Sequence, residues 1–143
     1  MFRRIKSLLA ALAATLIAAV SFTVATAAPA AAFGAETFGC RVSPGTILTW
    51  QPVCTNSRPA TTYNAGFAVL NTSGTYDFSW RIDGPYLGIF TGCDRTSSGC
   101  GVLVAGGSTD SVVTVTVTYT QNGQSATRSA TAIINGYCGG QLC

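Results

Sequence analysis

The feature that most constrains the fold is strict alternation of side chains near the C-terminal end of the chain. From Val113 to Thr120, valines and one tyrosine alternate with threonines, and a second alternating run follows from Ser125 to Ile134. Alternate residues of a β-strand point to opposite faces, and β-branched residues favour strands. Asn122-Gly123 lies between the two runs and is typical of a type I′ turn, because both central residues of that turn need positive φ. The region therefore predicts a long β-hairpin.

Two further observations concern the faces of the strands. Large apolar residues alternate with polar ones from Tyr76 to Asp83, which predicts a strand that packs its aromatic face, including Trp80, on a core. In the second run of the hairpin, Arg128 interrupts an inward face made mainly of alanines. We expect Arg128 to lie near a sheet edge, with its aliphatic stem covering apolar surface.

Shorter strand candidates follow the N-terminal apolar stretch, separated by turn signals rich in glycine, proline and asparagine. They are Thr46 to Val53 around Trp50, Thr61 to Leu70, Leu87 to Thr91, and Gly101 to Ala105. About seven short strands at this spacing in about 110 residues predict an all-β fold, an antiparallel β-sandwich.

The first 32 residues are predicted to be a secretory signal peptide, which leaves residues 33–143 as one β-sandwich domain. Three basic residues precede an alanine- and leucine-rich run from Leu8 to Val24, and small residues follow it. Cleavage after Ala32 is favoured, and cleavage after Ala27 also fits the rule for small residues. An uncleaved membrane anchor is the alternative, because the apolar run approaches the length that spans a bilayer. The signal peptide predicts a secreted, extracellular protein.

Six cysteines follow the apolar stretch, and an even number outside the cytoplasm predicts three disulfides. The favoured pairs are Cys93 with Cys100, Cys40 with Cys54, and Cys138 with Cys143. A cross-link of Cys54 to Cys138 is the competing arrangement. Zinc sites made of cysteines usually pair their ligands about two to four residues apart, and only the last gap in this chain fits that spacing. A metal site is therefore not expected.

The charged residues argue against several function classes. Beyond residue 32 the chain has five arginines and five acidic residues, with no lysine and no histidine. Nucleic-acid binding depends on a basic face, so nucleic acid is not an expected partner. A serine nucleophile would lack its usual base, and Asp77 and Asp83 would lie about 20 Å apart on one strand, too far for a glycosidase pair. We therefore predict a non-catalytic protein without a cofactor.

The segment from Thr75 to Gly84, TYDFSWRIDG, resembles the aromatic strand that carries the core tryptophan in bacterial immunoglobulin-like and PKD-like sandwich modules. Asp110 to Ile134 resembles their closing hairpin, and the likeness covers Ala60 to Ile134. It implies an immunoglobulin-like sandwich that acts in binding, spacing or adhesion. The disulfide of antibody-type domains is not expected, because Val112 to Thr120 contains no cysteine. A second resemblance, in size and local disulfide loops, is to the secreted sandwich apoproteins of enediyne antibiotics.

Two candidate contact surfaces remain, and the first is the polar loop from Cys93 to Cys100. Its candidate binding residues are Asp94, Arg95 and Thr96, with Arg95 at the tip. A disulfide across such a loop lowers the entropy cost of presenting it to a partner. Small secreted inhibitors of trypsin-like proteases present a basic residue in this way.

The second candidate surface is aromatic. Five side chains cannot all be assigned to inner faces: Trp50, Tyr63, Tyr86, Phe90 and Tyr137. An exposed row of such rings can stack on sugars, whereas buried rings would fill the core or close the ends of the sandwich.

Together these observations favour a secreted, non-catalytic binding or structural module. Its predicted partner is an extracellular protein or a cell-wall carbohydrate, with no membrane contact after signal cleavage. The alternative is a secreted protease inhibitor that presents Arg95 on the loop from Cys93 to Cys100.

Overall fold

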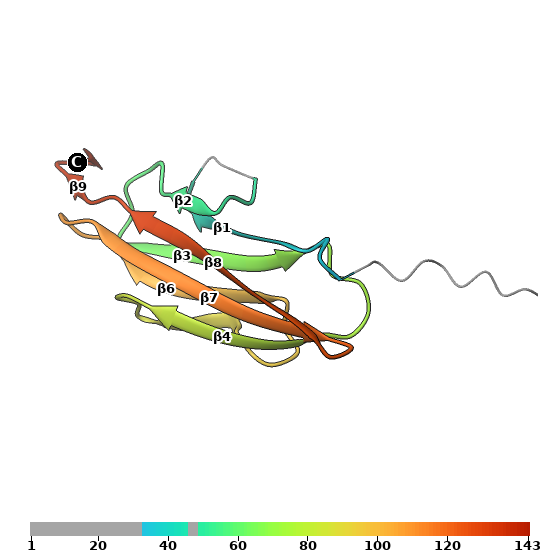
Figure 1. Cartoon of the computed structure of the whole chain (residues 1–143). Helices are drawn as coiled ribbons and strands as arrows, with labels where there is room; N and C mark the ends of the chain where they lie inside the picture. The colour runs from blue at the N-terminus through green and yellow to red at the C-terminus, as the bar shows by residue number, and fades with distance from the viewer. Residues whose placement is uncertain (1–32, 46–48) are drawn as a thin grey trace, which may run out of the picture.

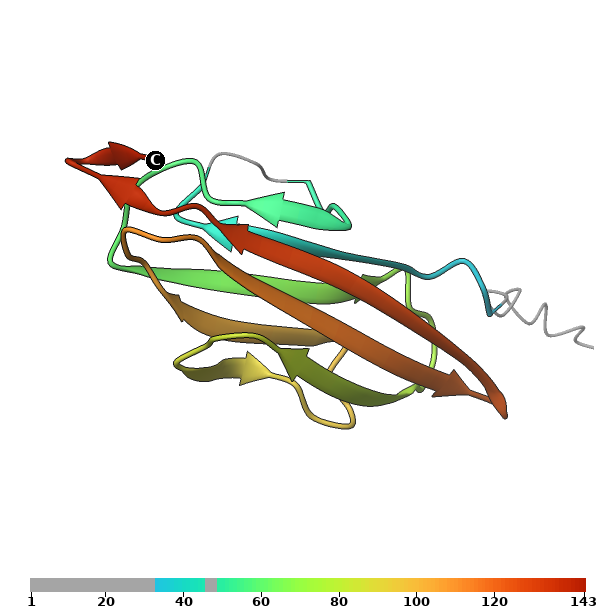
Figure 2. The same cartoon turned by 60° about the vertical axis from the view of Figure 1, so that its left-hand side comes forward.

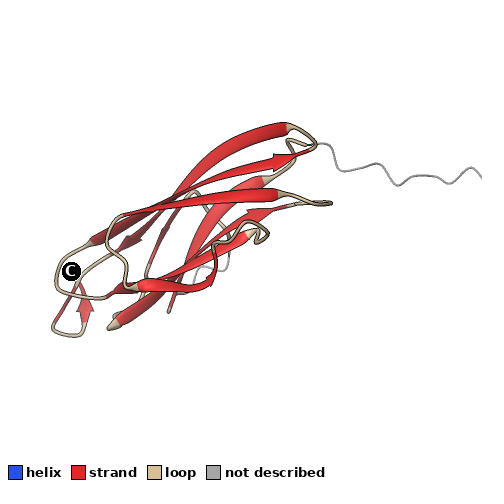
Figure 3. Ribbon diagram, turned by 90° about the horizontal axis from the view of Figure 1, so that it is seen from below, coloured by secondary structure: helices blue, strands red, loops and turns tan. Residues whose placement is uncertain are grey.

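The computed structural model describes residues 33–45 and 49–143. The predicted signal peptide and its cleavage sites lie outside the described residues, as do residues 46–48 of one predicted strand. The described residues form strands, turns and loops without a helix (Figure 3), so none of them forms a helix that could cross a membrane. The strands are β1 (Thr37–Ser43), β2 (Val53–Thr55), β3 (Thr62–Leu70), β4 (Asp77–Asp83), β5 (Gly88–Gly92), β6 (Gly99–Ala105), β7 (Ser111–Gln121), β8 (Gln124–Ile134), β9 (Tyr137–Cys138) and β10 (Gln141–Leu142).

Eight of these strands form two four-stranded sheets, which lie one against the other (Figure 1). The first sheet has the order β1-β3-β6-β5, and all its neighbouring strands are antiparallel. The second sheet has the order β2-β8-β7-β4, in which β2 runs parallel to β8 and the other pairs are antiparallel. β9 and β10 form a short ribbon at the opposite end of the molecule from the β7–β8 turn (Figure 2). The all-β prediction is confirmed, with one parallel pair that it did not include.

The predicted hairpin is present, because β7 and β8 pair along their whole length. Its turn has positive φ at both Asn122 (50°) and Gly123 (79°), as a type I′ turn requires. β2 pairs with only one part of β8, Thr131 to Ile133. Arg128 therefore lies on a free edge of β8, where its side chain is exposed.

The core lies between the sheets and consists of the inward side chains of both. The residues of β7, β3 and β6 that are at most 1 % exposed are Val113, Val115, Val117, Tyr119, Tyr63, Ala65, Phe67, Val102 and Val104. On β4, Phe78 is buried, but Trp80 and Ile82 are half-buried because β4 is an edge strand of its sheet. The predicted alternation of β4 is confirmed, whereas its aromatic face is less buried than predicted.

The strand predicted from Thr46 to Val53 is wrong in its described part. There Gln51 makes an isolated bridge to Cys40, and β2 begins only at Val53. Pro52 explains the break, because proline has no N–H with which to continue a ladder. β1 is missing from the sequence-based prediction, since its glycine, cysteine and arginine hide the alternation.

Three disulfides join the cysteines in the favoured arrangement, so the competing link of Cys54 to Cys138 is wrong. The bonds are Cys40–Cys54 between β1 and β2, Cys93–Cys100 at the loop between β5 and β6, and Cys138–Cys143 across the β9–β10 ribbon. The first bond links the two sheets along one edge. Three disulfides in a small domain are typical of extracellular proteins.

Candidate functional site

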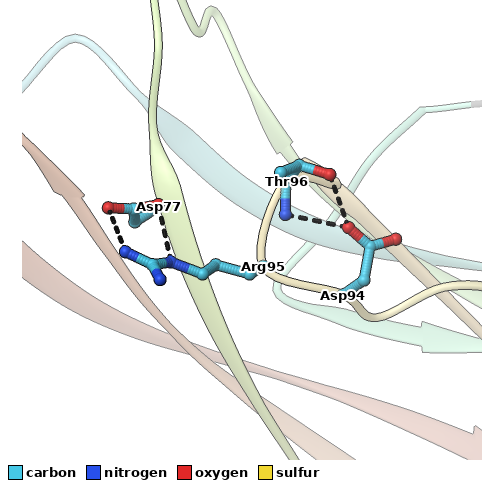
Figure 4. Close-up of polar contacts among 4 residues, drawn as sticks. All are labelled: Asp77, Asp94, Arg95 and Thr96. Atoms are coloured by element: carbon cyan, nitrogen blue, oxygen red, sulfur yellow. Dashed lines mark hydrogen bonds and ion pairs between the residues drawn. The ribbon is translucent and has the colours of Figure 1, made fainter.

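The loop between β5 and β6 carries the three residues predicted as a binding loop (Figure 4). Asp94 closes a turn, because its Oδ1 accepts hydrogen bonds from the backbone N and the Oγ1 of Thr96, both at 2.8 Å. Arg95 lies against the start of β4, where its guanidinium donates to both carboxylate oxygens of Asp77, at 2.8 and 3.1 Å. The side chains of Asp94, Arg95 and Thr96 thus form hydrogen bonds to other groups of the same protein.

These contacts also fix the charge state of the loop. The hydrogen bonds from Arg95 lower the pKa of Asp77, and the same contact raises the pKa of Arg95. Hydrogen bonds from Thr96 lower the pKa of Asp94. Both carboxyl groups are therefore ionised at neutral pH, and neither holds a proton that it could donate as a general acid.

The backbone of the loop is tied to both sheets. Phe78 N on β4 donates to Arg95 O, and Val69 N on β3 donates to Ser98 O, each at 2.8 Å. Trp80 Nε1 donates to Ser97 O at 3.2 Å. The loop therefore packs across one end of the sandwich, and Arg95 folds back on β4 although it is at the predicted tip.

The five aromatic residues singled out in the sequence divide by burial. Tyr63 is fully buried, Trp50 and Tyr137 are half-buried, and Tyr86 and Phe90 are 42 % and 48 % exposed. The prediction that these rings do not all lie on inner faces is confirmed. The structure brings Trp50 and Phe90 together at one surface feature, which the sequence did not show.

That feature is a groove on the outer face of the first sheet, flanked by Trp50 and Phe90. Two adjoining hollows, of about 320 and about 200 Å³, share Trp50, Gly66 and Phe90 in their linings. Along the floor, β3 and β6 place small residues at positions that alternate with the buried core: Gly66, Ala68, Gly99 and Gly101. Since these residues have little or no side chain, the strand backbone itself forms the floor.

The first wall of the groove, Trp50, is held by contacts to β1. The guanidinium carbon of Arg41 lies 4.0 Å from the centroid of the indole ring, a cation–π contact. The next residue, Gln51, pairs its backbone with Cys40 in both directions, at 2.7 and 3.3 Å. The indole therefore lies beside the sheet even though no regular strand carries it.

The second wall, Phe90, is placed by an irregularity of β5. The register between β5 and β6 shifts between Ile89 and Thr91, and such bulges re-aim side chains. The ring of Phe90 covers Gly101, where a Cβ would lie 2.5 Å from a ring carbon. Glycine is thus required at this position for the ring to lie over the sheet.

Polar side chains line both hollows. Arg41, Ser43 and Asn64 line the larger one, and Thr91 and Ser97 line the smaller one. Among the described residues that line the groove there is no carboxylate and no pairing of a nucleophile with a base. The groove can therefore bind a neutral ligand by apolar contact and hydrogen bonds, but it has no groups for acid–base chemistry.

The sequence carries a signal for the groove that was not among the predicted contact surfaces. Gly66 and Ala68 alternate with buried inward residues, as do Gly99 and Gly101 further along the chain. Two consecutive outward positions of each strand are therefore small, although larger residues such as Asn64 and Leu103 follow on the same face. The two strands pair in the structure with Gly66 opposite Gly101 and Ala68 opposite Gly99, and this register gathers the small residues into one floor.

Neither a metal centre nor a known family explains the groove. Within residues 33–45 and 49–143, no group of three or more histidine, cysteine or acidic side chains could hold a metal ion. No protein-family model, no curated protein and no solved structure matches this chain. The function must therefore be inferred from the geometry of the groove and the loop.

Proposed function

We propose that this protein is a secreted, non-catalytic extracellular binding module of the immunoglobulin-like and PKD-like class. The strand order supports the fold. In constant-type immunoglobulin domains, strands A, B, E and D form one sheet, and strands C, F and G form the other. The order β1-β3-β6-β5 corresponds to the first sheet, and β8-β7-β4 corresponds to G, F and C.

The position of Trp80 also supports this fold. β4 corresponds to strand C, which carries the core tryptophan of immunoglobulin domains. Trp80 packs against Phe38 and Phe78, with ring centroids 6.0 and 6.1 Å apart. The antibody-type disulfide between strands B and F has no counterpart here, because Cys40–Cys54 joins β1 to β2 at the edge. We therefore propose an immunoglobulin-like module that lacks the disulfide of antibody domains.

The single observation that carries a binding function is the groove between Trp50 and Phe90. Phe90 is 48 % exposed although it is large and apolar, and it lies beside a floor of glycine and alanine. Apolar surface gathered in a hollow with hydrogen-bonding groups around it is typical of ligand sites. The volume of the larger hollow, about 320 Å³, is within the range of such sites.

The loop of Arg95 offers less support for the alternative, protease inhibition. Arg95 would have to leave Asp77 before it could enter the acidic pocket of a trypsin-like protease. An inhibitory loop gains affinity from being held in its binding conformation, and this loop is held in another one. The groove is therefore the feature on which we base the function.

The test is a capture experiment with protein secreted from cells that express the full chain. The protein is immobilised and incubated with the cell wall and the secreted proteins of the producing cells. We expect capture by the wild type and loss of capture by Gly66→Thr, which fills the floor of the groove. The matched control is Gly88→Thr on β5, where a Cβ meets nothing within 4 Å and which does not line the groove. Equal capture by wild type and Gly66→Thr would overturn a binding function at this groove.

A further inference from the structure

We propose that the groove binds a neutral, β-linked saccharide chain, whose pyranose rings stack on Trp50 and Phe90. This inference rests on the proposed binding function and adds the chemical class of the ligand. It is carried by four features of the groove: its glycine floor, its aromatic walls, its neutral hydrogen-bonding groups, and strands that are already fully paired.

The first step concerns the glycine at the centre of the floor. Gly66 has no positive φ, and a Cβ at this position would lie 4.0 Å from both Arg41 O and Trp50 Cη2, which is ordinary contact. Neither the backbone nor the packing therefore requires glycine, in contrast to Gly101 beneath Phe90. Glycine in a strand interior weakens the strand, and it often marks a place where a ligand approaches the backbone. We infer that Gly66 keeps the floor free for a ligand.

The second step concerns the walls. The face of an aromatic ring carries partial negative charge and attracts groups with a positive edge. The axial C–H bonds of a β-linked pyranose lie on flat faces of the ring and present such partial positive charge. Trp50 and Phe90 line both hollows, so a chain of sugar rings that follows the groove would meet both aromatic side chains. Because the guanidinium of Arg41 covers one face of the indole, the sugar would stack on the opposite face of Trp50.

The third step concerns the polar groups. A sugar needs donors and acceptors for its hydroxyls, and Asn64 and Ser43 provide an amide and a hydroxyl group along the larger hollow. The hydroxyl of Ser97 in the smaller hollow already bonds to the backbone of Gly99 and adds at most one acceptor position. Among the described residues that line the groove, Arg41 is the one cation, and its guanidinium is stacked on Trp50. One stacked arginine, with no carboxylate among the lining residues that the structure describes, favours a neutral ligand over a polyphosphate or a basic peptide.

The fourth step separates a saccharide from an extended peptide. A peptide that binds a sheet usually adds a strand at an edge, where it finds free backbone donors and acceptors. The floor of this groove is made by β3 and β6, and each of them is paired on both sides. A ligand that lies across them must therefore bring its own apolar face and its own hydroxyls, as a saccharide does.

The experiment uses the secreted protein with three soluble hexasaccharides. The probes are the β-1,4-linked hexamers of N-acetylglucosamine and of glucose, with the α-1,4-linked glucose hexamer as the probe of different shape. Binding is followed by isothermal calorimetry and by tryptophan fluorescence. We expect saturable binding of at least one β-linked hexamer, with a fluorescence change, and weaker binding of the α-linked hexamer.

Two variants locate the binding. Gly66→Thr is expected to reduce affinity by at least about tenfold while the melting temperature stays the same or rises, since a β-branched residue favours a strand. Phe90→Ala is expected to reduce affinity by about tenfold, because it removes one aromatic ring on which a sugar would stack. The controls are Gly88→Thr and Leu87→Ala, because Leu87 is 64 % exposed, apolar and outside the groove. Affinity that Gly66→Thr and Phe90→Ala leave unchanged would overturn the site.

The ligand class can fail separately from the proposed function. If no hexamer binds but Gly66→Thr still abolishes capture from the cell wall or the secreted proteins, the saccharide proposal is overturned and the binding function stands. If the captured material is a protein that binds after all glycans are removed, the saccharide proposal is overturned in the same way. If Gly66→Thr changes neither measurement, both proposals are overturned.

Discussion

The outer faces of the two sheets differ sharply, although both rest on the same core. On the second sheet, hydroxyl side chains of β7 and β8 pair across the strands: Thr114 with Thr131, Thr116 with Ser129, Thr118 with Thr127, and Thr120 with Ser125, at 2.9 to 3.2 Å. On the first sheet, four neighbouring outward residues of β3 and β6 are glycine or alanine (Gly66, Ala68, Gly99 and Gly101), and two aromatic residues flank them.

The comparison supports the proposal that the outer face of the first sheet, and not that of the second, is the binding face. Paired hydroxyls on β-branched residues stabilise a sheet through cross-strand contacts and leave a closed surface. Glycines on the other face weaken the strands and leave a hollow. Selection for stability alone would favour the first pattern on both faces. The second pattern therefore marks the face on which function is expected.

The largest effect is expected from the core that both faces share. Phe67 lies on β3 between Gly66 and Ala68, but it points inward and is 1 % exposed. Phe67→Ala should lower the free energy of unfolding by about 3 to 5 kcal/mol, because truncation of a buried ring loses both transfer energy and packing. Trp80→Ala should cost less, since Trp80 is half-buried at the edge. Denaturant unfolding measures both changes, and a larger loss for Trp80→Ala would contradict this description of the core.

Much of this fold can be predicted from the sequence, for a physical reason. The β7–β8 hairpin and β4 show period-two alternation, and Asn122-Gly123 provides the turn that closes the hairpin. The disulfide pairs follow from short loops between neighbouring cysteines. β1 and the parallel strand β2 could not be predicted, because their pairing depends on contacts with strands distant in the sequence.

The candidate site is less predictable than the fold. The sequence indicated exposed aromatic residues, but it did not indicate that Trp50 and Phe90 flank one groove, because they come from different segments that meet only in the folded sheet. It also placed Arg95 at a loop tip without showing its partner, Asp77, which lies 18 positions earlier in the chain. Local patterns predict strands and turns well. A site built from several strands depends on register, which no local pattern contains.

The second prediction concerns a polar contact that is buried, unlike the hydroxyl pairs on the outer face. Glu36 is 5 % exposed, and its carboxylate accepts hydrogen bonds from the hydroxyl of Tyr76 and from Gly34 N. Tyr76→Phe should lower the free energy of unfolding at neutral pH by about 1.5 to 3 kcal/mol, the range for a hydrogen bond to a charged group. Thermal unfolding of both proteins measures the difference.

The pH dependence of that difference gives a sharper test. The hydrogen bond from Tyr76 holds the pKa of Glu36 below its ordinary value of about 4.5. The stabilisation is therefore fully present above that pH, and it is lost as the pH falls through the lower pKa of the folded protein. The destabilisation caused by Tyr76→Phe should shrink in acid. A difference that stays constant down to pH 2 would show that the contact does not depend on an ionised Glu36.

The third prediction tests the hydroxyl pairs themselves. Thr118→Ala removes the contact with Thr127 on the outer face of the second sheet. We expect a loss of about 0.2 to 1 kcal/mol in unfolding free energy, the usual range for a cross-strand pair, and no change in ligand binding. The double variant with Thr127→Ala should cost less than the sum of the single variants, since either substitution already removes the pair. A loss of ligand binding in Thr118→Ala would contradict the assignment of the two faces.

The smallest effect is expected from the ion pair between Asp77 and Arg95, which lies on the surface. Asp77→Asn keeps the shape of the side chain and removes its charge, and exposed ion pairs of this kind contribute little to stability. We therefore expect no measurable change in the free energy of unfolding.

The same substitution releases Arg95 from its ion pair, so it also tests protease inhibition. If Arg95 were an inhibitory residue restrained by Asp77, then Asp77→Asn would inhibit trypsin-like proteases more strongly than the wild type, and Arg95→Ala would not inhibit them. We expect all three proteins to leave the proteases active at micromolar concentration, because the proposed ligand site is the groove and the loop is not part of it. Inhibition that depends on Arg95 would move the proposed function from the groove to the loop.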